Sequence, residues 1–312
     1  MDTSSDNQTQ EPLRNYPLCG WNSWKVGGDA DFFYQPKNKE DIFYSLKWAK
    51  KKNLPVHFLG KGTNVLISDR GINGLVIGLQ KLNTYREWQK KGRLCIRALT
   101  GVSKAQVMQI FLRHKLAPAL FLCGLPGDVG GGVVMNAGVG QDISPKEFKD
   151  IVDWVKVIRG DKVIVIQSKD IKWKYRFSSG WEPGVIYEVG MSWPMEPLPD
   201  LSLRLKNIAL KRTQSQPLQS ASCGSVFKNP LTGEKSGALI DRCGLKGYRI
   251  GQACVSKKHA NFIVNMGGAR AGDIHNLIQH IQQTVKSKYG ILLEPEVRYM
   301  GRWDAMADTS LV

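Results

Sequence analysis

The 312-residue sequence predicts a mixed α+β fold in two or three domains, and three observations support this prediction. Strand-like and helix-like stretches alternate along the first half of the chain. Two runs rich in β-branched residues, 155–158 and 163–166, flank a Gly-Asp pair as in a β-hairpin. Apolar residues at helical spacing between 274 and 285 form the stripe of an amphipathic helix.

In the first half of the chain, residues 24–34 are expected to form a turn and then a strand, and apolar residues between 42 and 49 recur at helical spacing. Ser103 is a suitable N-cap for a helix that buries apolar residues between 107 and 111. Short apolar runs predict further strands at 56–58, 65–67, 74–77 and 94–96.

In the second half, prolines at 194, 197 and 199 mark a domain boundary before a basic helix around 205–210. The amphipathic helix is expected to begin near Asp273 and to end at Gly290. A strand over 292–299 is expected to follow it.

The formal net charge of +17 is compatible with nucleic acid, an anionic membrane surface or polyanionic substrates. The basic residues are spread along the chain, for example at 47–52 and 204–212, and no zinc-finger or RNA-recognition signature accompanies them. Most of them are therefore interpreted as solvated surface.

Six scattered cysteines form no Cys-x-x-Cys pair, and the five histidines are not spaced with them as ligands, so no metal site is expected. No run approaches the ~20 apolar residues that a membrane span needs, and the polar N-terminus resembles no signal peptide. We expect a cytoplasmic protein with a disordered N-terminal tail.

Two glycine-rich segments suggest a bound phosphate-bearing cofactor. Seven of the seventeen residues from Gly124 to Gly140 are glycine, and a second cluster follows a predicted strand at Gly60-Lys-Gly-Thr-Asn-Val65. Such turns let backbone N–H groups approach a diphosphate, although the glycines could instead serve only tight turns and close packing. Neither the Rossmann nor the P-loop pattern occurs in the chain.

Several motifs occur together in the order and approximate spacing of one family. They are the two glycine-rich segments, Lys25-Val-Gly-Gly28, Tyr175-Arg176, Ser222-Cys-Gly-Ser-Val-Phe-Lys-Asn-Pro230, the stretch 244–265 and Glu294-Pro-Glu-Val-Arg298. From about residue 21 to 301 the chain resembles the UDP-N-acetylenolpyruvoylglucosamine reductases, flavoenzymes of bacterial peptidoglycan synthesis.

The resemblance implies an FAD-binding region of the vanillyl-alcohol-oxidase (PCMH-like) type in two subdomains, followed by an α+β substrate-binding domain. The implied boundaries are a disordered tail over 1–15, FAD-binding subdomains over 16–84 and 85–197, the substrate-binding domain over 198–303 and a tail over 304–312. Only 49 positions separate Arg176 from Ser225 (225 − 176), which resembles the shorter subtype without a substrate-covering tyrosine loop.

Family members reduce FAD with NADPH and then transfer hydride from flavin N5 to the β-carbon of UDP-N-acetylglucosamine enolpyruvate, which gives UDP-N-acetylmuramate. By resemblance, Ser225 is the proton donor to the α-carbon, and Arg176 and Glu296 polarise the substrate carboxylate. Considered without the motif, Ser225 would be a turn residue and the other two a structural ion pair. A monomer is expected.

The resemblance also implies binding residues. The substrate is expected to contact Tyr175, Asn229 and His259, although His259 could equally be a core residue. For FAD the matching positions are Gly60, Lys61, Gly62, Thr63, Asn64, Val65, Gly124, Pro126, Gly127, Gly131, Asn136 and Gly138.

Three places depart from the family pattern, one of them the altered segment 138–142 after the Asn-Ala-Gly motif. Asp128 replaces a small hydroxyl residue, and an acid beside a diphosphate is unfavourable unless it is paired or turned away. Gly180 replaces a large or aromatic residue. Together with the charge of +17, the departures at Asp128 and Gly180 leave open a basic nucleic-acid-binding module on a degenerate flavoprotein scaffold. An FAD-dependent sugar oxidase of the same fold is a second alternative.

Overall fold

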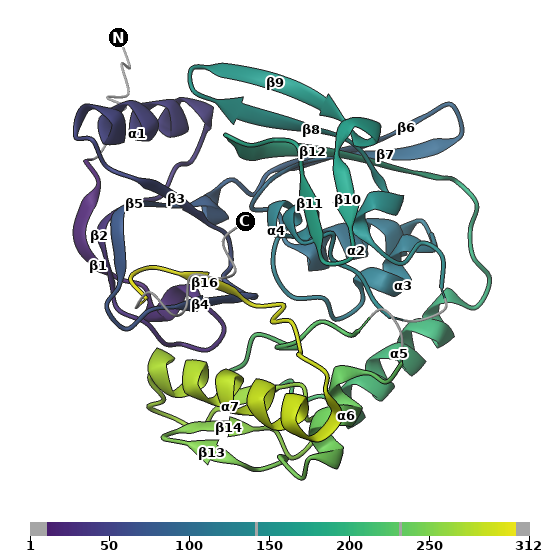
Figure 1. Cartoon of the computed structure of the whole chain (residues 1–312). Helices are drawn as coiled ribbons and strands as arrows, with labels where there is room; N and C mark the ends of the chain where they lie inside the picture. The colour runs from purple at the N-terminus through teal and green to yellow at the C-terminus, as the bar shows by residue number, and fades with distance from the viewer. Residues whose placement is uncertain (1–10, 141–142, 231–232, 304–312) are drawn as a thin grey trace.

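The computed structural model describes residues 11–140, 143–230 and 233–303, which form three parts around a common centre (Figure 1). The tail expected over 304–312 and the first ten residues of the tail expected over 1–15 lie outside the described residues. The prediction for 1–15 was too long, because strand β1 already begins at Leu13 and pairs with β2.

The N-terminal part is a four-stranded sheet in the order β1-β2-β5-β3, covered by helix α1. Asn38 caps α1 by accepting a hydrogen bond from the Asp41 N–H, and the helix buries Ile42 and Ala49 against β5 and the neighbouring part. Its elements are β1 (Leu13–Pro17), β2 (Asp29–Tyr34), α1 (Lys39–Lys51), β3 (Val56–Leu59), β4 (Val65–Ile67) and β5 (Ile72–Gly78).

The middle part is an antiparallel sheet in the order β6-β7-β12-β8-β9 with helices α2, α3 and α4 packed on one face. The hairpin predicted around Gly160-Asp161 is confirmed as β8 and β9. The elements are β6 (Tyr85–Lys90), β7 (Arg93–Leu99), α2 (Lys104–Arg113), α3 (Pro118–Leu122), α4 (Val129–Val134), β8 (Val152–Arg159), β9 (Lys162–Gln167), β10 (Lys172–Lys174), β11 (Phe177–Ser179) and β12 (Val185–Pro194).

The C-terminal part packs helices α6 and α7 against a three-stranded sheet, and α5 leads into it from the middle part. The predicted amphipathic helix is confirmed as α7, and Gly290 ends it in the left-handed region at φ +71°. The elements are α5 (Leu201–Ser215), α6 (Ser236–Arg242), β13 (Arg249–Ile250), β14 (Ala253–Val255), β15 (Ile263–Asn265), α7 (Ala271–Tyr289) and β16 (Arg298–Met300).

The strand predicted over 292–299 was wrong in extent, since β16 begins only at Arg298. Pro295 has no N–H to donate and makes a single isolated bridge to Phe227. β16 then pairs in parallel with β4, more than 200 residues earlier in the chain, so the C-terminal segment returns to the first glycine-rich segment.

In the described ranges, no helix combines the length and apolar character that crossing a membrane requires. Among the same residues, no group of three or more His, Cys, Asp or Glu side chains is arranged to hold a metal ion. All six cysteines are free thiols.

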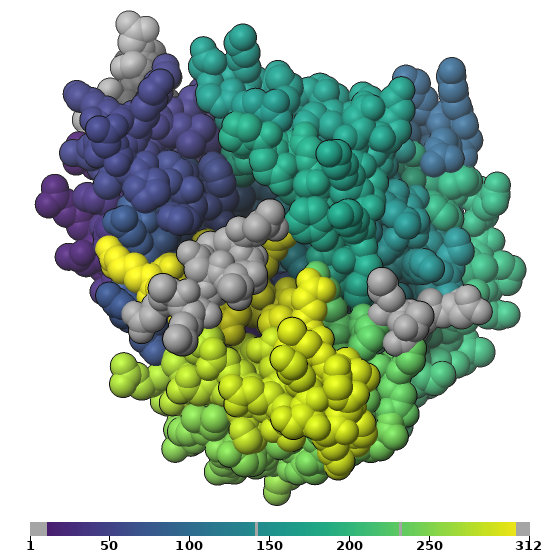
Figure 2. Space-filling view, viewed as in Figure 1, coloured from purple at the N-terminus to yellow at the C-terminus, as the bar shows by residue number. Residues whose placement is uncertain are grey.

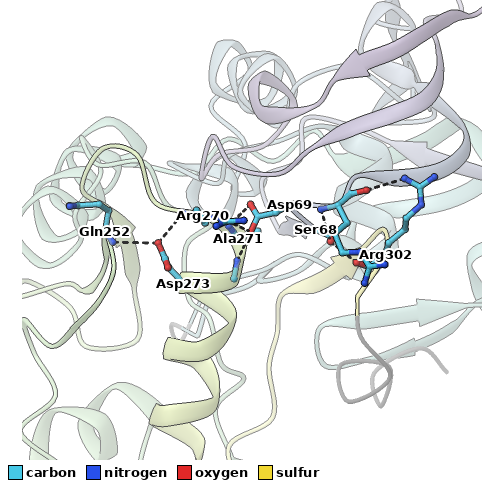
Figure 3. Close-up of polar contacts among 9 residues, drawn as sticks. Ser68, Asp69, Gln252, Arg270, Ala271, Asp273 and Arg302 are labelled. Atoms are coloured by element: carbon cyan, nitrogen blue, oxygen red, sulfur yellow. Dashed lines mark hydrogen bonds and ion pairs between the residues drawn. The ribbon is translucent and has the colours of Figure 1, made fainter.

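A polar junction joins the N-terminal part to α7 (Figure 3). Asp69, in the loop after β4, accepts hydrogen bonds from the N–H groups of Ala271 and Gly272, both at 2.9 Å. These donors lie in the first turn of α7, where helical N–H groups otherwise have no partner and the helix dipole favours a carboxylate. On the other side of the same helix end, Asp273 accepts from Arg270 N–H at 3.0 Å. Asp69 is therefore an N-cap supplied by a distant segment.

We expect Asp69→Ala to lower the free energy of unfolding by about 1–2 kcal/mol, because two helix N–H groups lose their acceptor. Chemical denaturation monitored by circular dichroism measures this change. Glu40→Ala is the matched control: its exposed ion pair with Lys39 is expected to contribute less than about 0.5 kcal/mol. Equal unfolding free energies for the two variants would contradict the assignment.

Candidate active site

The three parts meet at a large cavity of about 1940 Å³. Figure 2 shows the purple-to-blue N-terminal part at upper left, the teal middle part at upper right and the green-to-yellow C-terminal part below them. The lining comes from both glycine-rich segments, the turn between β10 and β11, the segment after α5 and the segment after α7. Residues from the whole length of the chain thus face one cavity.

The two glycine-rich segments are held together by Asp128. Its carboxylate accepts hydrogen bonds from the N–H of Lys61 in the first segment, at 2.7 Å, and from the N–H of Gly131 in the second, at 2.8 Å. Asp128 is only 4% exposed and is the N-cap of α4. The acid that departs from the family pattern is therefore paired with backbone donors, which removes the objection raised by its charge.

Two glycines permit this close approach. A Cβ on Gly60 would collide with the Asp128 carboxylate, and a Cβ on Gly127 would lie 2.7 Å from the Thr63 hydroxyl oxygen. Gly127 also has φ +99°, which strains any other residue. The glycines are thus required by the packing of one segment on the other. Packing and ligand binding are compatible roles, because the cavity opens beside the same backbone.

Ser225 and Glu296 lie on neighbouring segments joined through Val226, whose carbonyl accepts a hydrogen bond from the Glu296 N–H at 2.7 Å. The Val226 N–H in turn donates to the carbonyl of Asn261 at 2.8 Å. The buried Asn261 side chain fixes the next residue, Phe227, by bonding to both its N–H and its carbonyl. The segment that carries Ser225 is therefore rigidly placed, and both Ser225 and Glu296 line the cavity.

Arg176 occupies the turn between β10 and β11 at φ +55°, an unusual conformation for a residue with a side chain. Its guanidinium donates to the carbonyl of Gly138 at 2.9 Å and pairs with Glu296, with Nε 3.2 Å from Oε1. It also lies over the ring of Tyr175, 4.8 Å from the centroid. Strained residues held by several contacts cluster at functional sites, so this turn is a candidate reaction centre.

Burial raises the pKa of Glu296 above its usual range, while the nearby charges of Arg176 and Lys228 oppose this rise. Desolvation has the larger effect. A carboxyl group in this position retains its proton to higher pH than an exposed glutamate does, and can then donate a hydrogen bond into the cavity.

The structure brings most of the predicted site residues to this cavity. The three residues predicted to be catalytic line it, as do Tyr175, Asn229 and His259. Of the predicted FAD contacts, the following line it: Gly60, Lys61, Gly62, Thr63, Asn64, Val65, Gly124, Pro126, Gly131 and Gly138.

Gly127 and Asn136 are not among the lining residues. Gly127 instead supports the contact between the two segments, as described above. Asn136 is 1% exposed and adopts φ +39°; its amide donates to the carbonyl of Lys174 at 3.1 Å and accepts from the Lys149 N–H at 3.0 Å. The Asn136 side chain thus fixes the backbone at Lys174, where the turn that carries Arg176 begins.

The predicted substrate contacts differ in how they are held. Tyr175 is 40% exposed, whereas the Asn229 side chain accepts from the Ser236 N–H at the start of α6. The ring of His259 accepts from the Asn261 N–H at 3.2 Å, and burial lowers its pKa. At neutral pH His259 is therefore an uncharged ring beside the segment that carries Ser225.

Among the cations at the cavity that were missed from the sequence are Arg212 and Lys104. Arg212, interpreted there as solvated surface, donates to the carbonyl of Gly124 at 2.9 Å and lines the cavity. Lys104, in the first turn of α2, is 6% exposed and also lines it. A lysine in a first helical turn is unusual because the helix dipole favours acids there. That position was the available signal for Lys104.

Comparison with known proteins agrees with this arrangement. A family model described as "UDP-N-acetylenolpyruvoylglucosamine reductase, C-terminal domain" matches residues 216–300, and a model described as "FAD binding domain" matches residues 30–166. The UDP-N-acetylenolpyruvoylglucosamine reductase of Synechococcus elongatus is 38% identical over 92% of this chain and 94% of its own length. That of Caldanaerobacter subterraneus is 35% identical over 92% and 93%.

A solved structure extends the agreement to three dimensions. The reductase of the same name from Thermus caldophilus superposes with a TM-score of 0.76 at 29% identity, covering 93% of this chain and 98% of that one. The predicted α+β fold, an FAD-binding region of PCMH type followed by the family's C-terminal domain, is confirmed. The chain therefore belongs to the UDP-N-acetylenolpyruvoylglucosamine reductases, the FAD-containing, NADPH-using oxidoreductases (UDP-N-acetylmuramate dehydrogenases) of peptidoglycan precursor synthesis.

Proposed function

We propose that this protein reduces the enolpyruvyl group of UDP-N-acetylglucosamine enolpyruvate with NADPH, giving UDP-N-acetylmuramate. The observation that carries the proposal is the convergence of Ser225, Arg176 and Glu296 on the cavity that both glycine-rich segments line. Each of these residues has a distinct chemical role in such a conjugate reduction.

FAD, when bound, supplies the hydride that originates from NADPH. The residues that would hold it are the lining members of the two glycine-rich segments, with backbone N–H groups as the main donors. The close packing of the two glycine-rich segments supports this assignment of the FAD site. Cβ atoms at Gly60 and Gly127 would force the two segments apart and displace the backbone N–H groups that line the cavity. Asn64 adds a link to the reaction centre by donating to the Glu296 carbonyl at 3.0 Å.

Arg176 and Glu296 would bind the enolpyruvyl carboxylate. Hydride addition at the β-carbon builds negative charge at the α-carbon and its carboxylate, and cations or hydrogen-bond donors placed there lower the barrier. Arg176 is a permanent planar donor, and the burial that raises the pKa of Glu296 favours its protonated form, which would add a second hydrogen-bond donor. Their existing pair, 3.2 Å apart, places both groups side by side.

Ser225 would deliver a proton to the α-carbon. In the described part of the chain its hydroxyl has no hydrogen-bond partner, although the backbone around it is fixed by Asn261 and Phe262. A hydroxyl is a weak acid, so it serves as a donor only against a strongly basic carbon centre at short range. A fixed backbone with a free hydroxyl meets that requirement.

We also propose that the enzyme is of the shorter subtype, without a tyrosine loop that covers the substrate. The span between Arg176 and Ser225 is occupied by β11, β12 and α5 and their connections. Tyr175 also lines the cavity, with its ring against Arg176.

The test is an anaerobic visible spectrum of the purified protein, recorded while NADPH and then UDP-N-acetylglucosamine enolpyruvate are added. We expect the flavin band to bleach with NADPH and to return with the enolpyruvyl sugar. UDP-N-acetylglucosamine, which lacks the acceptor double bond, is the matched control and should leave the flavin reduced. A flavin that NADPH bleaches but the enolpyruvyl sugar does not restore would overturn the proposal.

A further inference from the structure

A buried lysine lies where the two glycine-rich segments cross. Lys104 is 6% exposed, and its backbone N–H donates to the carbonyl of Gly127 at 3.0 Å, so the residue is anchored to the second segment. Its ammonium lies 6.0 Å from the centroid of the Phe148 ring, and its side chain lines the cavity. Lys104 is thus almost enclosed by protein at the edge of the cavity that the two glycine-rich segments line.

The ammonium of Lys104 is incompletely neutralised. Throughout the described residues, no carboxylate lies within 4.0 Å of Nζ and no protein oxygen accepts a hydrogen bond from it. The charged groups that face it are Asp128 at the start of α4, Lys61 in the first segment and Arg176 in the β10–β11 turn. Both Asp128 oxygens already accept from backbone N–H groups. Three cations thus surround one engaged carboxylate.

A buried ammonium without a close partner is costly, so this arrangement favours an anionic ligand. FAD carries one permanently ionised group, its diphosphate, whereas the oxidised isoalloxazine ring is uncharged. We propose that Lys104 binds the FAD diphosphate and supplies the side-chain cation that complements the backbone N–H groups of the two glycine-rich segments. Asp128 then has a positioning role, since it holds the segments together and lies next to this cation.

This assignment makes FAD affinity depend on pH. In the protein without ligand, burial lowers the pKa of Lys104 to about 8, with Asp128 opposing the shift and Arg176 and Lys61 adding to it. A bound diphosphate raises that pKa. The contribution of Lys104 to binding is therefore complete below the pKa of the free protein and is lost as pH rises through the higher pKa of the complex.

The experiment titrates FAD into the full-length protein from which FAD has been removed and whose fold has been verified. Quenching of flavin fluorescence measures FAD binding at pH values between 6.5 and 9.5. At pH 7 we expect Lys104→Met to weaken FAD binding about tenfold or more, as for a lost charged hydrogen-bond donor. Lys104→Arg keeps the charge and should recover most of the affinity. Lys50→Met, which removes one charge from the exposed face of α1, is the matched control and should bind as the unmodified protein does.

Two further readouts separate the diphosphate from the rest of the cofactor. ADP, which carries a diphosphate but no flavin, should compete with FAD less well in Lys104→Met than in the unmodified protein. The unmodified protein should lose FAD affinity above pH 8, and Lys104→Met should lose much less. Unchanged FAD affinity in Lys104→Met would overturn the proposal, and so would weaker FAD binding with unchanged ADP binding, since the partner would then be the flavin ring. The pH profile of the unmodified protein provides a test that needs no variant.

Discussion

Ser225→Ala is expected to slow the oxidative half-reaction, in which the reduced flavin is reoxidised by the enolpyruvyl sugar, by about 10²-fold or more, as for loss of a general acid. Reduction of the flavin by NADPH should keep its normal rate, because that step needs no proton at the substrate α-carbon. Stopped-flow absorbance measures the two half-reactions separately. The separation matters because a variant with damaged FAD binding would lose both.

The structure offers close controls for this variant. Ser222 lies three residues earlier in the same segment and also lines the cavity, so Ser222→Ala makes the same chemical change without touching the proposed donor. Ser225→Cys keeps a proton donor in place and should retain more activity than Ser225→Ala. The backbone at Ser225 is fixed by its bridge to Phe262 and by the neighbouring Asn261, so loss of one hydroxyl should leave the fold intact. Full turnover in Ser225→Ala would exclude its role as proton donor.

The parts of the fold that depend on local patterns were predictable from the sequence. The apolar stripe of α7 and the β8–β9 hairpin depend on residues close together in the chain, and both predictions are confirmed. No local sequence pattern predicts the pairing of β16 with β4, because these strands lie more than 200 residues apart in the chain. Without that partner in view, the apolar residues after Gly290 resembled one long strand, although Pro295 interrupts it.

The candidate site shows the same division. Ser225, Arg176 and Glu296 were identified through motifs, and each lines the cavity. The roles of Lys104 and Arg212 depend on which residues of other segments surround them, and a count of basic residues cannot reveal this. Asn136 is a contrasting case: its position in a glycine-rich motif predicts an FAD contact, and its buried side-chain amide bonds to the backbone of Lys174 and Lys149. Burial and direction of a side chain are tertiary properties.

Arg176→Met is the second variant with a large expected effect. Removing the planar donor should slow the oxidative half-reaction by about 10²–10³-fold, as for loss of one preorganised donor to a developing charge. Arg176→Lys keeps a charge but loses the paired N–H donors, so its rate should lie between those of the unmodified protein and Arg176→Met. Arg93→Met is the matched control, because Arg93 contacts Ser192 on the middle sheet and does not line the cavity.

The pH profile of Arg176→Met tests Glu296 at the same time. Burial raises the pKa of Glu296 and the charge of Arg176 opposes that rise, so removing Arg176 should raise the pKa further. If the protonated carboxyl is the form that assists the reaction, the rate falls as pH increases through this pKa, and the fall should begin at higher pH in Arg176→Met. The variant would then be slower at its maximum but less sensitive to alkaline pH. If the rate of Arg176→Met fell at the same pH as that of the unmodified protein, another group would control the pH profile. Glu296→Gln keeps a neutral hydrogen-bond donor, so its rate should not fall with pH in this range.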